Sequence, residues 1–324
     1  MELLINLLMA ILLALSLSNC SNAAENSIRT TNPEGVQQVM KTHYIGRFAI
    51  DVPVEFKLAA QSHKIRYAEI LDFKWSSGER TKERDTLWMQ KIAKIKKMPK
   101  PVDKKTTLIE EVTFPSIAKW AKGVLYYGDY LLTQRLFWTI QVDYGETGIW
   151  LTIAGTNKDK MVKNFTNILA HYDSGLRQAQ TESFFLNYGK ILLPYLEQEE
   201  SYARFEGPKE MVLRLEIRET HKVEETGVID RLAASLSVNF APGVDVNKIR
   251  AGKRTVSGLA GQEIVTRLSD KEGKELFFAW DYQGREDSGE HPEIKIGIEC
   301  PDENIREKLE LWDKVVNSFR LATK

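Results

Sequence analysis

The chain has 324 residues, 43% of them apolar and 28% charged, which is typical of globular domains and long enough for two of them. Its 45 basic and 45 acidic residues give a formal net charge of zero. Because no overall field attracts nucleic acid or an anionic membrane, neither is indicated as a partner of the whole molecule.

The first twenty residues form an apolar segment unlike the rest of the chain. The run ELLINLLMAILLALSL is shorter than the roughly 20 residues of a membrane-spanning helix and predicts an export signal peptide over residues 1–20. Residues 17–20, Leu-Ser-Asn-Cys, resemble a lipobox in which Cys20 becomes the lipid-bearing first residue. Residues 21–23, Ser-Asn-Ala, instead suit an ordinary signal peptidase, and both alternatives place the mature chain outside the cytoplasm.

The next segments alternate between strand and helix patterns. Residues 21–42 are polar and are expected to form a tether. Helical spacing begins at Glu79 and is ended by Pro99, and a second helix is predicted over residues 157–172 with Asn157 as its N-cap. Alternating apolar residues predict strands in IGRFAIDV (45–52), KIRYAEILDF (64–73), TTLIEEVTF (106–114), SIAKWAKGVLYYG (116–128), LTQRLFWTIQVDYG (132–145) and GIWLTIAGT (148–156).

A polar stretch over residues 174–182 is the expected linker between two domains, residues 43–173 and 183–324. Beyond it a helix is predicted over residues 227–238, and Asp302 is expected to cap the last helix. The strands predicted in this half are MVLRLEIRE (211–219), GQEIVTRLS (261–269), KELFFAWDY (274–282) and EIKIGIEC (293–300).

Each half therefore repeats a strand, a helix, several antiparallel strands and a closing helix. This order predicts an α+β fold of two domains, each a mostly antiparallel sheet with packed helices. The echo between RLFWTIQVDYG and ELFFAWDYQG, together with the shared order of elements, suggests an ancient duplication.

The sequence offers no recognisable reactive centre. It contains no G-x-S-x-G, Walker, H-E-x-x-H or C-x-x-C motif, so no catalytic residue, metal ligand or cofactor is expected. No two of the five histidines are three or four residues apart, and His221 beside Glu224 and Glu225 is better explained as a charged loop before a helix. Cys300 shares one strand face with three isoleucines and is expected to be a core residue.

The basic stretch KIAKIKKMPKPVDKK, residues 91–105, admits a membrane or nucleic-acid interpretation. Its apolar residues continue the stripe of the preceding helix, which is more simply the side packed on the sheet. On that interpretation the lysines form the solvent-facing side.

Several stretches together carry a family resemblance. They are YIGRFAIDVP (44–53), ESFFLNYGKILL (182–193), and RTVSGLAGQEIVTRL (254–268) followed by FFAWDYQG and HPEIKIGIEC. This set resembles the immunity proteins that protect bacteria from lipase effectors of type VI secretion systems. The family often carries cysteines before the Gly-Arg pair and near the start of its second domain, where this chain has Tyr44 and Phe185.

The resemblance implies a periplasmic protein without catalytic activity, whose two α+β domains grip a secreted phospholipase and block its lid or substrate entrance. The partner-binding residues are then expected in loops between strands: Tyr126, Tyr127, Tyr130, Arg285, Glu286 and Asp287. An envelope lipoprotein that binds lipid or scaffolds other proteins is the alternative, and an unrecognised hydrolase is a third hypothesis.

Overall fold

The structure is a computed structural model that describes residues 27–29, 38–76, 78–175, 182–220, 222–223, 245–271, 273–289 and 291–323. The expected signal peptide with Cys20, most of the tether and the linker, His221, and the helix expected over residues 227–238 lie outside the described residues. Among the described residues no helix is long and apolar enough to cross a membrane.

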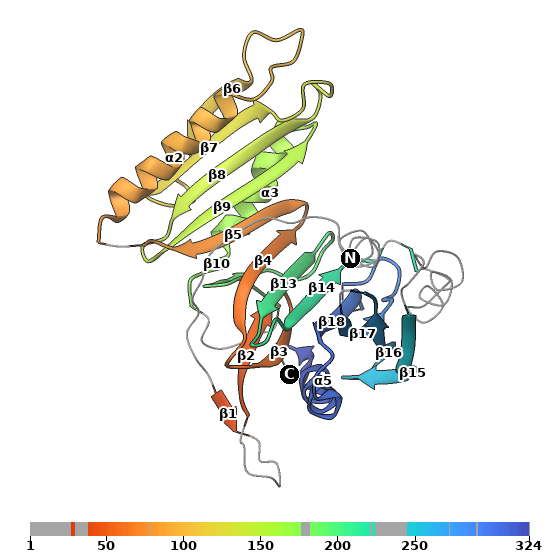
Figure 1. Cartoon of the computed structure of the whole chain (residues 1–324). Helices are drawn as coiled ribbons and strands as arrows, with labels where there is room; N and C mark the ends of the chain where they lie inside the picture. Colours follow the sequence, from red (N-terminus) through yellow and green to blue (C-terminus); the bar gives the residue numbers. More distant parts are fainter. Residues whose placement is uncertain are drawn as a thin grey trace. The chain divides into compact units, whose positions relative to one another are not determined.

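The chain folds into two compact units (Figure 1). Residues 62–199 form one of them, here called the inserted unit. The chain up to Gln61 and from Glu200 to Ala322 forms the other, here called the discontinuous unit. This division differs from the expected domains, because residues 43–61 belong with the C-terminal part of the chain and residues 183–199 belong with the inserted unit.

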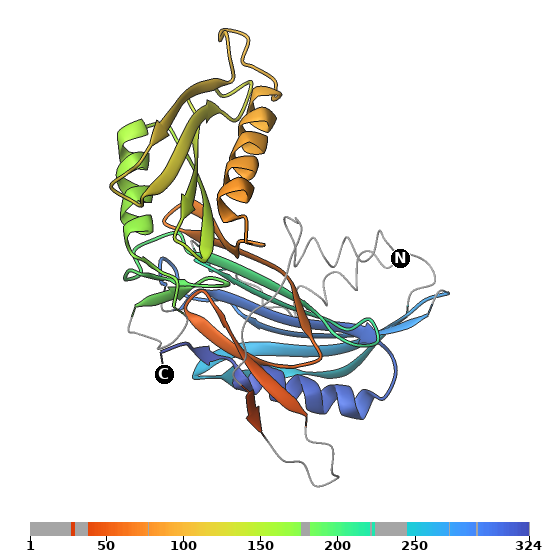
Figure 2. The same ribbon diagram turned by 90° about the vertical axis from the view of Figure 1, so that its left-hand side faces the viewer.

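The inserted unit is built on an antiparallel sheet in the order β4-β5-β9-β8-β7-β6. Its strands are β4 (Lys57–Ile65, which begins in the discontinuous unit), β5 (Ala68–Lys74), β6 (Leu108–Thr113), β7 (Trp120–Tyr127), β8 (Leu136–Asp143) and β9 (Thr147–Gly155). Its helices are α2 (Arg80–Lys96) and α3 (Lys158–Ala170), which lie on opposite faces of the sheet (Figure 2).

Successive side chains of β7 point to opposite faces of the sheet, so the two helices pack in separate cores. Ala121 and Leu125 pack on one face with the buried stripe of α3, whereas Val124 and Tyr126 pack on the other with the buried residues of α2. The predicted N-cap is confirmed, since the side chain of Asn157 accepts a hydrogen bond from the backbone N–H of Lys160 at 3.0 Å.

A small sheet closes the inserted unit, in the order β10 (Tyr172–Asp173), β12 (Lys190–Leu192) and β11 (Ser183–Phe185). Asp72 of β5 holds it in place. This buried carboxylate accepts hydrogen bonds from the backbone N–H groups of Asn187 at 2.9 Å and Tyr188 at 2.8 Å, and from the Tyr172 hydroxyl at 3.3 Å. Burial raises the pKa of Asp72 to about 6, although these hydrogen bonds oppose the shift.

The discontinuous unit has a sheet in the order β15-β16-β17-β18-β14-β13, followed by the first part of β4. Its strands are β13 (Glu200–Glu206), β14 (Val212–Arg218), β15 (Asp245–Val256), β16 (Leu259–Ser269), β17 (Lys274–Tyr282) and β18 (Glu293–Pro301). A second sheet contains β1 (Ser27–Arg29), β2 (Val39–Ile45), β3 (Phe48–Pro53) and β19 (Arg320–Leu321). Helix α5 (Ile305–Ser318) joins one core with both sheets through Trp312 and Val316.

The expected α+β class is confirmed: antiparallel sheets pack with α2 and α3 in the inserted unit and with α5 in the described part of the discontinuous unit. The two main sheets also share one strand order: β6-β7-β8-β9-β5-β4 corresponds to β15-β16-β17-β18-β14-β13, and α3 corresponds to α5. This correspondence agrees with the duplication that the sequence suggests.

Two stretches expected to be single strands are hairpins. IGRFAIDV turns at Gly46, whose φ is 59°, so that Ile45 pairs with Phe48. KIRYAEILDF turns at Arg66 and Tyr67, with φ of 48° and 69°. Positive φ at both central residues is the geometry of a type I′ turn, which is usually formed by Asn and Gly. Because Arg and Tyr occupy these positions here, the turn could not be recognised from the sequence.

The expected capping role of Asp302 is also corrected. The N-cap of α5 is Asn304, in a left-handed conformation. Asp302 instead accepts two hydrogen bonds from the guanidinium of Arg267, at 2.6 and 3.1 Å. A bidentate pair with arginine gives this carboxylate stronger partners than the helix end would.

Candidate partner-binding loops

Tyr126 lies in the core of the inserted unit. It is 7% exposed, packs with Trp88 and Ile95 of α2, and its hydroxyl lies 3.3 Å from the hydroxyl of Thr139. Burial raises its pKa. The expectation that Tyr126 contacts a partner is therefore corrected, because a residue buried under a helix has no surface to offer.

Tyr127 and Tyr130 lie at the surface of the same unit. Tyr127 is half-buried, and the ammonium of Lys104 stands 5.8 Å from the centre of its ring. Tyr130 is 52% exposed in the loop between β7 and β8. Two residues that the sequence reasoning missed are more prominent in this loop, Leu131 at 72% exposed and Leu132 at 46%. The signal was present as two consecutive leucines inside a predicted turn region.

The second expected loop follows β17 in the discontinuous unit, and its three charged residues are exposed. The backbone N–H of Arg285 donates to the carbonyl of His291 at 2.8 Å, and that of Asp287 donates to the carbonyl of Thr220 at 2.8 Å. The Glu286 carboxylate accepts a hydrogen bond from the backbone of Val223 at 3.4 Å. The loop thus has a fixed backbone and presents a mixed set of charges to solvent.

Gly284 explains how this loop leaves the sheet. Its φ is +78°, and an added Cβ would lie 2.8 Å from the backbone of both His291 and Glu293. Only glycine fits so close an approach in a left-handed conformation. The chain can therefore fold back over itself at this point and hold Arg285 to Asp287 at the surface.

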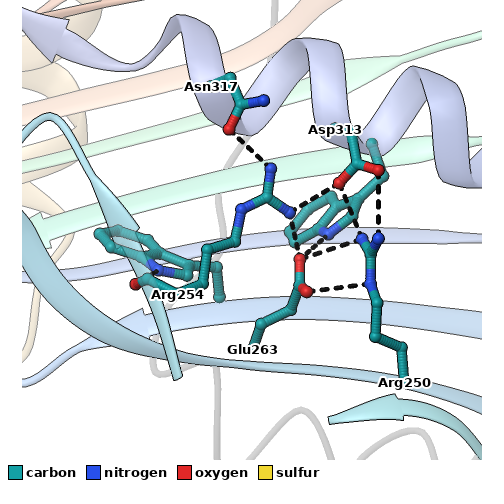
Figure 3. A network of polar contacts seen from close by, with 7 residues as sticks. Arg250, Arg254, Glu263, Asp313 and Asn317 are labelled. Atoms are coloured by element: carbon teal, nitrogen blue, oxygen red, sulfur yellow. Dashed lines mark hydrogen bonds and ion pairs between the residues drawn. The ribbon is translucent and has the colours of Figure 1, made fainter. Parts of the chain in front are cut away.

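A polar network fastens α5 to the sheet of the discontinuous unit (Figure 3). At its centre is Glu263 of β16, which is 6% exposed. Its carboxylate accepts hydrogen bonds from the indole of Trp312 at 2.6 Å and from Arg250 at 3.1 Å, and it also binds the guanidinium of Arg254. Three donors on one buried carboxylate satisfy its charge without water.

Both arginines of the network also reach α5. Arg250 binds Asp313 through two hydrogen bonds of 2.8 and 3.1 Å. Arg254 donates to Asp313 at 2.8 Å and to Asn317 at 2.8 Å. Burial raises the pKa of Asp313, but the hydrogen bonds and charge of Arg250 outweigh it, so the pKa is lowered and the carboxylate stays ionised. The network orients the helix and stabilises its position.

The segment 258–263, which carries much of the family resemblance, supplies the centre of this network. Gly258, with φ of +83°, forms the turn between β15 and β16. A Cβ on Gly261 would lie 2.7 Å from the Trp280 ring, so only glycine lets this strand approach. Glu263 follows on the face that receives the two arginines.

Cys300 is a core residue, as expected. It is 3% exposed, and burial raises the pKa of its thiol to about 11. A thiol in that state is protonated at neutral pH and unreactive. No group of three metal-ligating side chains comes together within the described parts of the chain.

Residues 186–323 match the family model of the Tle cognate immunity protein 4 C-terminal domain. The match confirms the resemblance to lipase immunity proteins. No curated protein sequence matches the chain.

Three solved structures share the fold of this chain, and two of them are of an immunity protein of a type VI secretion system. The apo immunity protein TplEi from Pseudomonas aeruginosa is 18% identical, with a TM-score of 0.68 over 88% of this chain and 98% of its own. A chain of the Tle4–Tli4 complex is 16% identical, with a TM-score of 0.70 over 88% of this chain and 98% of its own. TplEi bound to an "L" peptide is 18% identical, with a TM-score of 0.66 over 88% and 99%. At these identities the likeness establishes the shared fold.

Proposed function

We propose that this chain is an immunity protein that binds a phospholipase effector of a type VI secretion system, covers its substrate entrance and so protects the producing cell. The observation that carries the proposal is the match of residues 186–323 to the Tle cognate immunity protein 4 family. The shared fold with TplEi and with a chain of the Tle4–Tli4 complex, over 88% of this chain, supports it.

Occlusion is physically sufficient for this role. A lipase must open an apolar cleft to its lipid substrate, and a rigid surface seated over that cleft excludes lipid. A stable interface buries about 1,600 Å² in total, with a few aromatic or arginine residues contributing most of the affinity. Tyr127, half-buried at the end of β7, and the exposed loop from Arg285 to Asp287 are the contact residues we propose, since each presents side-chain surface at an ordered strand end or loop.

The proposal gives the chain no catalytic step. The buried, protonated thiol of Cys300 supports this, because the residue is inaccessible to a substrate. Incubation of the purified chain with phospholipid vesicles is expected to release no fatty acid above the buffer rate. Turnover by the chain alone would contradict the assignment.

We further propose that the protein acts in the periplasm, where lipidated Cys20 tethers it to the membrane. The sequence of residues 17–20 supports this. Labelling with radioactive palmitate is expected to mark the wild-type chain and not Cys20→Ala. Label on both proteins, or a wild-type chain recovered from the cytosol, would contradict it.

Protection in cells tests the function. The phospholipase effector that we expect to be encoded beside this chain's gene is directed to the periplasm, with or without the chain. Survival is expected only with co-expression, and a pull-down from the periplasm is expected to recover the two proteins in equal amounts. Equal killing in both strains would refute the proposal.

A further inference from the structure

Two loops lie together at one end of the inserted unit (Figures 1 and 2). One joins α2 to β6 (residues 97–107) and the other joins β7 to β8 (residues 128–135). The backbone N–H of Tyr127 donates to the carbonyl of Thr107 at 3.0 Å, which ties the end of one loop to the start of the other.

Exposed apolar side chains gather in these loops. Among the described residues ten large apolar side chains are exposed, and four of them are here: Val102 at 98%, Leu131 at 72%, Tyr130 at 52% and Leu132 at 46%. We call these four residues the apolar tip. Single exposed apolar residues are ordinary, but such a concentration in two short adjacent loops marks an interaction surface.

The backbone under the apolar tip is fixed by short-range hydrogen bonds. The N–H of Lys104 donates to the carbonyl of Pro101 at 3.1 Å, which places Val102 in a turn. The carboxylate of Asp129 accepts hydrogen bonds from the N–H groups of Leu131 at 2.7 Å and Leu132 at 3.3 Å. The apolar side chains are therefore held outward by turns that do not depend on a partner.

The loop that carries Val102 is positively charged. The segment from 97 to 107 has four lysines and one aspartate, a local charge of +3, in a chain whose formal net charge is zero. Lys104 pairs with Asp103 at 2.8 Å. Lys100 and Lys105 are exposed, and no acidic side chain in the described part of the chain pairs with either.

We propose that this end of the inserted unit docks on an anionic phospholipid surface, with the apolar tip among the headgroups and Lys100 and Lys105 against lipid phosphates. Exposed apolar side chains next to a lysine-rich loop fit such a surface, which offers a shallow apolar layer beneath negative charge. An apolar cleft of a protein partner could bind the apolar tip, but it would leave Lys100 and Lys105 without a role, so a lipid surface fits these residues better. A contact of this kind is weak alone and would act beside a lipid anchor, since stable attachment takes two signals.

The test is co-flotation with vesicles, using the chain from residue 21 onward so that neither the expected signal peptide nor a covalent lipid contributes. Vesicles of phosphatidylethanolamine and phosphatidylglycerol at three to one are compared with vesicles of phosphatidylcholine. The parent protein is expected to float with the anionic vesicles, and V102S/L131S is expected to lower the partition coefficient about tenfold. K100Q/K105Q is expected to lower it by roughly tenfold or more on anionic vesicles and to change nothing on neutral ones.

Met89→Ser is the matched control, because Met89 is an exposed apolar residue of α2 (62%) outside the apolar tip. It is expected to bind like the parent. Failure of the parent to float, or equal binding by V102S/L131S, would overturn the proposal. If V102S/L131S floated like the parent but no longer bound the effector, the apolar tip would be a contact surface for the effector. That result would also overturn the proposal. The flotation contains no effector, so its result is independent of the proposed inhibitory function.

Discussion

The two units share one strand order but fasten their closing helices in different ways. In the inserted unit, α3 is tied to the turn between β4 and β5: the Asn164 side chain donates to the carbonyl of Arg66 at 2.6 Å, and Arg66 donates to Asn167 at 2.8 Å. In the discontinuous unit, α5 is tied to the opposite edge of the sheet, through Glu263 on β16. Both units share the same periodicity of apolar residues. The polar contacts that hold the closing helix differ between the two units.

The largest expected effect comes from breaking the network around Glu263. Glu263→Ala leaves two arginines and the Trp312 indole without their shared acceptor. Removing one partner of a buried ion network costs about 3–5 kcal/mol in the free energy of unfolding. Urea unfolding followed by tryptophan fluorescence measures it, and hydrogen exchange is expected to show α5 losing more protection than α3.

Glu310→Ala is the control for this variant. It removes an exposed carboxylate of the same helix, whose 3.6 Å pair with Arg306 is worth less than about 0.5 kcal/mol. A Glu263→Ala protein as stable as this control would show that the network does not hold the helix.

A smaller effect is expected from pH at Asp72 in the inserted unit. Its pKa of about 6 in the folded chain exceeds the ordinary 3.8, so the folded state binds the proton more tightly than the unfolded state. The contribution of Asp72 to stability is complete below about pH 4 and falls as pH rises through 6, by up to about 3 kcal/mol. Asp72→Asn removes this dependence.

Urea unfolding of wild type and Asp72→Asn at pH 5 and pH 7.5 isolates the effect. Half-buried His43 and buried His63, with pKa values lowered from 6.5 to about 4 and about 3, also make stability depend on pH, but they are common to both proteins and cancel in the difference. The stability difference between the two proteins is expected to change with pH, with wild type losing relative stability at pH 7.5. A difference that is constant with pH would show that Asp72 titrates normally.

The smallest effect separates core from surface within the inserted unit. Tyr126→Phe removes a buried hydroxyl beside Thr139 and is expected to cost about 1 kcal/mol of unfolding free energy. Tyr130→Ser changes an exposed side chain and is expected to stay within about 0.5 kcal/mol of wild type. Thermal unfolding of the two variants compares them. A larger loss for Tyr130→Ser would mean that its loop supports the fold.

Local pattern was enough to predict about half of the strands and all three described helices, because alternation and helical spacing report burial directly. It missed β13 and β15, and the expected tether contains β1 and the start of β2. It missed the turn at Arg66 and Tyr67, where two residues without turn preference adopt positive φ. It also missed the insertion of one unit into the other. Which strands pair is decided by contacts between distant residues, such as those of β2 and β3 with α5, and no local window contains them.

The candidate surface was predicted only in part. Loop placement correctly put Tyr130 and the segment from Arg285 to Asp287 at the surface, but it could not distinguish Tyr126 as buried, because the strand extends to Tyr127 and α2 covers it. The network around Glu263 could not be predicted either, because it too depends on contacts between residues far apart in the sequence. Its members are up to 67 residues apart, between Arg250 and Asn317, and nothing in the spacing of charges along the chain brings them together.

Titration of a purified effector tests the central claim most directly. The phospholipase that we expect to be encoded beside this chain's gene is assayed on lipid vesicles with increasing amounts of the chain. Occlusion predicts that lipid hydrolysis falls linearly to zero at one chain per enzyme. Full hydrolysis in the presence of excess chain would contradict it.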